Sequence, residues 1–105
     1  MTPPLLYNVA PELEAELTKL LIEAEEPALA DRVKDLVIHD RCRCGDSFCS
    51  SFYTVSERRT PFPNGFRTIA LRPGGLHLDV LGSTILKVEV LFRDDLRTKI
   101  RAAMP

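Results

Sequence analysis

The sequence predicts one α+β domain: N-terminal helices packed on a mostly antiparallel five-stranded meander sheet, and a short C-terminal helix. Apolar residues recur with helical spacing in the first third of the chain and alternate with polar residues in the last third. Turns rich in glycine and proline separate the short alternating runs. With 105 residues, 45% of them hydrophobic, we expect a single domain over residues 1–105.

The first helix is predicted over residues 11–25, after a lead-in at residues 1–9. Pro11 suits a first helical turn, where its missing N–H would have had no partner. Pro27 ends this helix, and we expect a shorter one over residues 27–35. The apolar residues of the first helix share one face: Leu13, Leu17, Leu20, Leu21 and Ala24.

The last two strands are the clearest, because their apolar residues alternate with polar ones around a two-residue turn at Gly82-Ser83. We expect Lys87 and Glu89 to lie outside the core, and a final helix to run from Asp94 to about Ala103. The strands are predicted at residues 36–43, 48–55, 66–72, 76–81 and 84–92, with a loop at 56–65. The strand residues expected to be buried are Leu78, Val80, Leu86, Val88 and Val90.

Charge and composition exclude several classes of partner. The formal net charge is -1, so we expect neither nucleic acid nor a membrane surface as a partner. The N-terminus lacks the basic region and apolar core of a signal peptide, and no apolar run approaches the ~20 residues of a membrane helix. Three cysteines, an odd number, fit a reducing compartment, so we expect a cytoplasmic protein.

The densest candidate chemistry lies between residues 39 and 49, where His39-x2-Cys42-x-Cys44-x4-Cys49 places four ligand types together. Three thiolates and an imidazole could bind zinc tetrahedrally. Alternation along a strand turns His39 away from Cys42 and Cys44, so the expected metal cluster is Cys42, Cys44 and Cys49. The candidates for a fourth ligand are Asp46, Asp79 and His77.

A structural interpretation of the cysteines competes with the metal interpretation. In a regular strand, Cys42 and Cys44 share a face with Leu36 and Ile38, and cysteine is among the most buried residue types. On this interpretation the thiols are reduced, fill core volume and hold no cofactor, with zinc as the alternative. A Cys44–Cys49 disulfide is geometrically feasible, but a reducing compartment opposes it.

Two stretches of the chain carry a resemblance to a known group of proteins. They are the hairpin with Cys42-Arg43-Cys44-Gly45 and Cys49, and the C-terminal strands at residues 75–80 and 85–91. Together they resemble small uncharacterised bacterial proteins that carry a Cys-Gly-rich hairpin. The resemblance implies no activity, because none is established for that group.

No other residues form a recognisable catalytic motif, so we expect a protein without catalysis. Ser47, Ser50 and Ser51 lack the G-x-S-x-G pattern of a nucleophile elbow. His77 and Asp79 lie two apart on a strand, as an acid/base pair or as unrelated exposed groups. The expected function is a protein-binding or regulatory module that docks on a larger partner, an immunity-type inhibitor being one example. The alternative is a zinc-binding domain centred on Cys42, Cys44 and Cys49.

Overall fold

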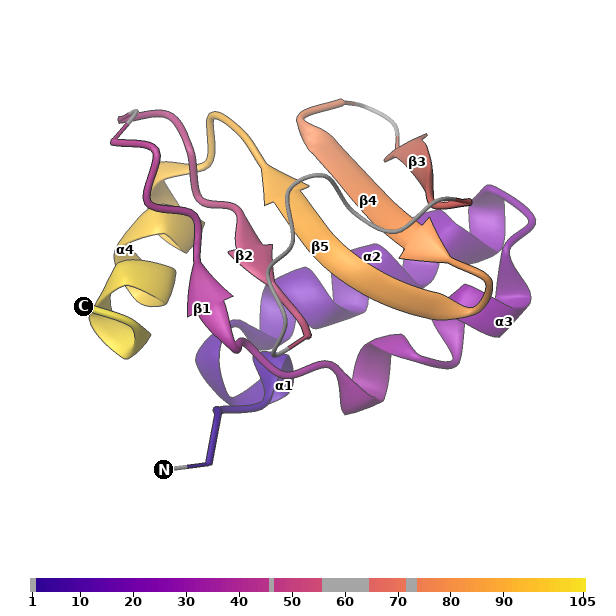
Figure 1. The fold of residues 1–105 in the computed structure, drawn as a ribbon, viewed down its shortest axis with the longest axis horizontal. Helices are drawn as coiled ribbons and strands as arrows, with labels where there is room; N and C mark the ends of the chain where they lie inside the picture. The colour runs from indigo at the N-terminus through magenta and orange to yellow at the C-terminus, as the bar shows by residue number, and fades with distance from the viewer. Residues whose placement is uncertain (1, 46, 56–64, 72–73) are drawn as a thin grey trace.

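The computed structural model describes residues 2–45, 47–55, 65–71 and 74–105, so most of the predicted loop at 56–65 lies outside the described residues. The α+β fold class is confirmed (Figure 1). The elements, in chain order, are α1 (Leu6–Val9), α2 (Pro11–Glu23), α3 (Pro27–Ala30), the 3₁₀ turn η1 (Val33–Asp35), β1 (Asp40–Arg41), β2 (Phe52–Tyr53), β3 (Arg67–Leu71), β4 (Leu76–Leu81), β5 (Thr84–Val90) and α4 (Asp94–Ala103).

The five strands form one antiparallel sheet in the order β1-β2-β5-β4-β3. Consecutive strands pair within β1–β2 and within β3–β4–β5, but β2 pairs with β5 rather than with β3. The predicted meander is therefore divided into two parts that meet at β5. Val88 of β5 lies at this junction, opposite Leu78 of β4 on one side and Phe52 of β2 on the other.

The strands predicted at 36–43 and 48–55 are much shorter than expected, because their flanking backbone groups bond elsewhere. Val37 forms an isolated bridge with Leu5, and the Ile38 N–H donates to the Pro4 carbonyl at 2.8 Å. The segment after η1 thus pairs with the N-terminal residues before it reaches β1. The regular strands are therefore only two residues long each, Asp40–Arg41 in β1 and Phe52–Tyr53 in β2.

Helix α1 falls in the stretch that the sequence predicts as a lead-in, so that prediction is wrong. Leu6 is fully buried, and its N–H donates to the Leu36 carbonyl at 2.8 Å. A single helical turn is too short to show a 3.6-residue period, so its position follows from these tertiary contacts.

Helix α2 confirms the prediction within two residues and ends in an uncommon way. Glu25 has a φ of 60°, a left-handed conformation that favours glycine. Its N–H donates to the Ile22 carbonyl at 3.1 Å, and the Glu26 N–H donates to the Leu21 carbonyl at 2.9 Å. This pair of hydrogen bonds defines a Schellman ending, with glutamate where glycine is the usual residue.

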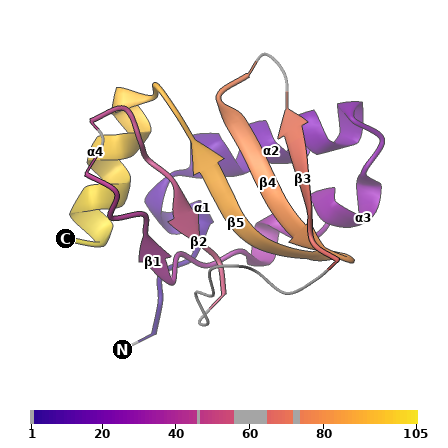
Figure 2. The same cartoon turned by 45° about the horizontal axis from the view of Figure 1, so that its top comes forward.

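Helices α1, α2 and α3 lie on one side of the sheet, and α4 lies at the end of the sheet near β1 and β2 (Figures 1 and 2). The predicted strand positions are confirmed as buried, and Lys87 and Glu89 are only half-buried. A bulge between Asp79 and Val80 changes the register, so Ile85 is buried as well. The apolar face of α2 that faces this core consists of Leu13, Leu17 and Leu21.

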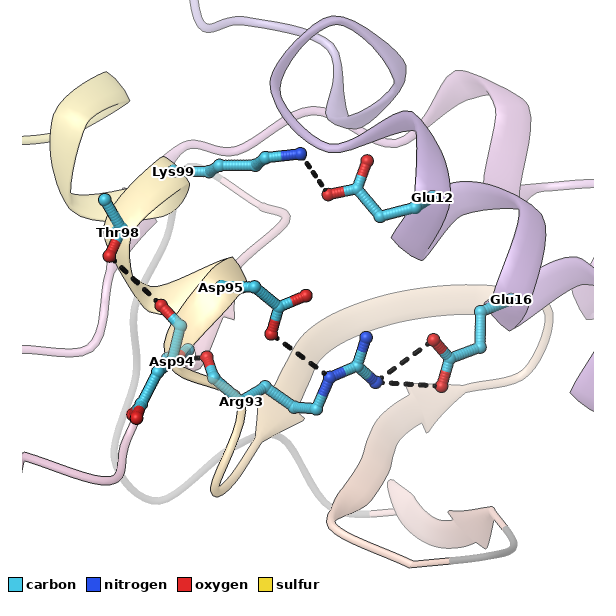
Figure 3. A network of polar contacts seen from close by, with 8 residues as sticks. Glu12, Glu16, Arg93, Asp94, Asp95, Thr98 and Lys99 are labelled. Carbon is cyan, nitrogen blue, oxygen red and sulfur yellow. Dashed lines mark hydrogen bonds and ion pairs between the residues drawn. The ribbon is translucent and has the colours of Figure 1, made fainter.

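A network of ion pairs fastens α4 to α2 (Figure 3). Arg93 Nη1 lies 3.0 Å from the Glu16 carboxylate, and Arg93 Nε lies 3.5 Å from Asp95. One turn further along α4, Lys99 pairs with Glu12. Leu96 and Ile100 of α4 are buried. Arg97 Nη1 donates to the Ser47 carbonyl at 2.6 Å, which places the C-terminal helix beside the hairpin that carries the cysteines.

Candidate metal centre

The three cysteines lie on the connection between β1 and β2. Cys42 and Cys44 follow β1, and Cys49 precedes β2, so the connection folds back on itself between them. The Cys42 N–H donates to the Ser51 carbonyl at 2.8 Å and joins the two arms. Gly45 has a φ of 84°, which the turn after Cys44 requires and which a residue with a Cβ adopts only under strain.

Backbone contacts with the end of β5 fix the position of Cys49. Cys49 forms an isolated antiparallel bridge with Leu91, and the Ser50 N–H donates to the Val90 carbonyl at 2.8 Å. The Val90 N–H in turn donates to Ser51 Oγ at 3.0 Å. Ser50 and Ser51 are both buried. The two serines that follow Cys49 therefore anchor it to the central strand of the sheet.

The cysteine Sγ atoms of this hairpin all lie within 4.8 Å of one another. Their exposure differs: Cys44 is exposed, Cys42 is half-buried, and Cys49 is 8% exposed. The prediction that Cys42 and Cys44 fill core volume is therefore wrong. The regular strand ends at Arg41, so the alternation of faces that grouped these cysteines with Leu36 and Ile38 does not reach them.

Cys49 sits in surroundings that favour its thiolate. In the structure its Sγ donates to Ser51 Oγ at 3.4 Å. Burial disfavours the charged form. Once the proton has left, however, the thiolate accepts hydrogen bonds from the Ser51 hydroxyl and backbone N–H and from the other two thiols, and these outweigh burial. The pKa of Cys49 consequently lies below its ordinary value. Ser50 and Ser51 therefore act here as anchors and hydrogen-bond partners, roles that no sequence motif indicates.

Within the described part of the chain, the three thiols form the only cluster of His, Cys, Asp or Glu with metal-binding spacing. His39 lies outside that cluster, as the prediction for this histidine states. Two of the fourth-ligand candidates lie on β4 instead: His77 Nδ1 is 3.4 Å from Glu89 Oε2, and Asp79 accepts a hydrogen bond from a threonine of β3. Asp46 lies outside the described residues.

An exposed aromatic pair lies beside the thiols. Phe48 precedes Cys49, and Phe92 follows the residue that bridges to Cys49; their ring centroids are 5.2 Å apart. Phe92 is 75% exposed, has a φ of 61°, and its N–H donates to the Phe48 carbonyl at 2.8 Å. This pair could not be predicted from the sequence, because 43 intervening residues separate the two rings and no local pattern joins them.

The thiol arrangement fits a thiophilic metal ion. Zinc–sulfur bonds are about 2.3 Å long, so sulfur ligands of a tetrahedral zinc lie about 3.8 Å apart. The Sγ atoms here all lie within 4.8 Å of one another, and this limit is about 1 Å longer than the sulfur–sulfur distance in a zinc site. Rotation of exposed or half-buried side chains such as Cys44 and Cys42 supplies a contraction of that size without moving the sheet.

Comparison of the chain with protein-family models, with curated proteins and with solved structures finds no match. Among the described residues, no helix has the length and apolar character needed to cross a membrane. The site and its surroundings are therefore the basis for a functional assignment.

Proposed function

We propose that this protein is a zinc-binding domain whose ligands are Cys42, Cys44 and Cys49. The observation that carries the proposal is the convergence of the three Sγ atoms within 4.8 Å. The exposed and half-buried positions of Cys44 and Cys42 remove the packing explanation for these two residues. Thiolates are soft ligands, and zinc is one of the ions that such ligand sets select.

The surroundings of Cys49 assist metal uptake, because a thiol must lose its proton before it binds a metal. The hydrogen bonds from Ser51 that lower the pKa of Cys49 reduce the cost of that step. Cys44 provides access from solvent, since its side chain is exposed. The three cysteines leave one position of the tetrahedral shell for a further ligand, such as a water molecule or Asp46, which lies outside the described residues.

The test is the zinc content of the full-length protein purified under reducing conditions without added metal, followed by titration of the metal-free protein. We expect one zinc per chain by elemental analysis. Replacement of zinc by cobalt(II) should give the intense near-ultraviolet charge-transfer bands of cobalt–thiolate bonds, whose intensity rises with the number of thiolates. Each of the variants Cys42→Ser, Cys44→Ser and Cys49→Ser should lose most of the affinity for zinc, because each removes one of the three ligands.

The matched control is His39→Gln, which changes a neighbouring metal-ligand residue that lies outside the thiol cluster. This variant should keep the zinc and the cobalt spectrum of the unchanged protein. Metal-free protein that binds zinc no better than the Cys49→Ser variant would refute the proposal. A zinc site that survives Cys49→Ser but not His39→Gln would place the ligands elsewhere.

Among the described residues, the exposed Phe48–Phe92 pair is an observation that supports the protein-docking interpretation of the sequence. This pair is a small apolar surface, and nothing around it indicates the chemistry of an occupant. The metal interpretation is more specific, because the three thiols define both the ligand atoms and the class of ion.

A further inference from the structure

The cysteines that flank the turn differ sharply in their access to solvent. Cys44 is exposed beside Gly45, whereas Cys49 is buried and anchored to β5 through the bridge with Leu91. Their Sγ atoms nevertheless lie within 4.8 Å of each other. One thiol is open to small oxidants, and the other is held beside it and shielded from them.

This pairing is typical of a thiol that is oxidised together with a thiol that resolves the oxidised product. A disulfide requires sulfur atoms about 2.05 Å apart and Cβ atoms about 3.5–4.5 Å apart. Cys44 can move toward Cys49, because it directly precedes Gly45 and lies outside the regular strands. Cys49 stays in place, since the two serines that follow it are bonded to Val90.

We propose that Cys44 and Cys49 form a reversible disulfide when the protein meets a peroxide. The Cys44 thiolate attacks one peroxide oxygen: an S–O bond forms, the O–O bond breaks, and the departing hydroxide takes a proton to become water. The Cys49 thiolate then attacks the Cys44 sulfur: the S–S bond forms, the S–O bond breaks, and the departing hydroxide takes a proton from solvent and leaves as a second water. Two electrons pass from the two sulfurs to the peroxide, and a dithiol reductant restores both thiols.

The disulfide and the zinc site exclude each other, an inference that rests on the proposed function. Zinc takes three thiolates here, and the disulfide removes two of them. Oxidation therefore releases the metal, and bound zinc slows the reaction of both thiols with peroxide. The hairpin then has two alternative states, a reduced state with metal and an oxidised state without it.

Digestion with trypsin distinguishes a Cys44–Cys49 disulfide from a disulfide that includes Cys42. Cleavage after Arg41, Arg43 and Arg58 leaves Cys42 in the dipeptide 42–43, and leaves Cys44 and Cys49 together in the peptide 44–58. After treatment of the metal-free protein with hydrogen peroxide, we expect peptide 44–58 to be lighter by about 2 Da, the mass of two hydrogens. The loss should be reversed by dithiothreitol. The number of reactive thiols should fall from three to one.

Three variants of the full chain serve as controls, with far-ultraviolet circular dichroism to show that each remains folded. Cys42→Ser should still form the disulfide within peptide 44–58, whereas Cys44→Ser and Cys49→Ser should not. A peptide in which the 42–43 dipeptide is linked to 44–58 would overturn the assignment of the pair. A mass gain of about 32 Da on Cys44 without a cross-link would overturn the resolving role of Cys49.

Zinc release is measured separately, with a chromogenic chelator, on the zinc-loaded protein. We expect full release as the disulfide forms, and retention of zinc after complete oxidation would refute the mutual exclusion. The peptide experiment uses metal-free protein, so it gives its result even if the chain binds no zinc. Failure of the zinc proposal and failure of the disulfide proposal are thus distinguishable.

Discussion

Glu25→Gly should stabilise the protein, because Glu25 adopts a left-handed conformation at the end of α2. Its φ of 60° costs a residue with a Cβ about 1–2 kcal/mol relative to the right-handed region. Glycine removes this cost. It also gives the unfolded chain more conformational entropy, which lowers the free energy of unfolding by about 0.5–1 kcal/mol. Both Schellman hydrogen bonds use backbone groups and survive the change. The expected net gain is about 0.5–1 kcal/mol in the free energy of unfolding.

The assay is urea unfolding followed by circular dichroism, with a thermal scan as a second measurement. For a domain of this size, a gain of about 0.5–1 kcal/mol raises Tm by about 2–8 °C. The matched control is Glu23→Gly, which introduces the same residue two positions earlier, at the last residue of α2. There the backbone is helical, and glycine should lower stability by about 0.5–1 kcal/mol. Equal destabilisation by both changes would refute the reasoning from the left-handed φ.

Three other changes test the core, the helix contacts and the hairpin. Val88→Asp should unfold the domain, as judged by circular dichroism, because an unpaired buried charge costs several kcal/mol of the ~5–15 kcal/mol available; a folded variant would contradict the register. Glu12→Gln should cost less than about 1 kcal/mol at neutral pH. Lys99 holds the pKa of Glu12 below its ordinary value, so this contribution is present above the unfolded-state pKa of about 4.3. The difference from the unchanged protein in urea midpoint should therefore vanish as the pH falls through the lower, folded-state pKa, and a constant difference would contradict the ion pair. In metal-free protein, Cys42→Ala with Cys44→Ala should lower stability by less than about 1 kcal/mol in urea, since neither thiol is fully buried; a loss above 2 kcal/mol would restore the core interpretation.

The C-terminal half of the fold could be predicted from sequence because its signals are local. Leu76–Leu81 matches the predicted strand, and the two-residue turn at Gly82 sets the start of β5. Alternation of apolar and polar residues along each strand is sufficient to identify the buried face. The bulge beside Val80 is the exception, because Ile85 and Leu86 are adjacent in sequence and both are buried.

The N-terminal half depends on contacts that sequence periodicity does not encode. The pairing of Leu5 with Val37 shortens the predicted strand, and the pairing of β2 with β5 joins segments more than thirty residues apart. At the candidate site, spacing grouped the three cysteines and their Sγ atoms do lie close together, but the inference that Cys42 and Cys44 are buried failed. It assumed a continuous strand through Cys44, whereas the strand ends at Arg41.

None of the cysteines belongs to the hydrophobic core cluster of the described residues. A cross-link between Cys44 and Cys49 closes a ring of about six residues, which restricts the unfolded chain by only about 2 kcal/mol. A cross-link of this kind constrains the hairpin alone and does not connect distant parts of the chain. The proposed disulfide would therefore change the covalent state of the hairpin while the sheet and its helices keep their cooperative unfolding.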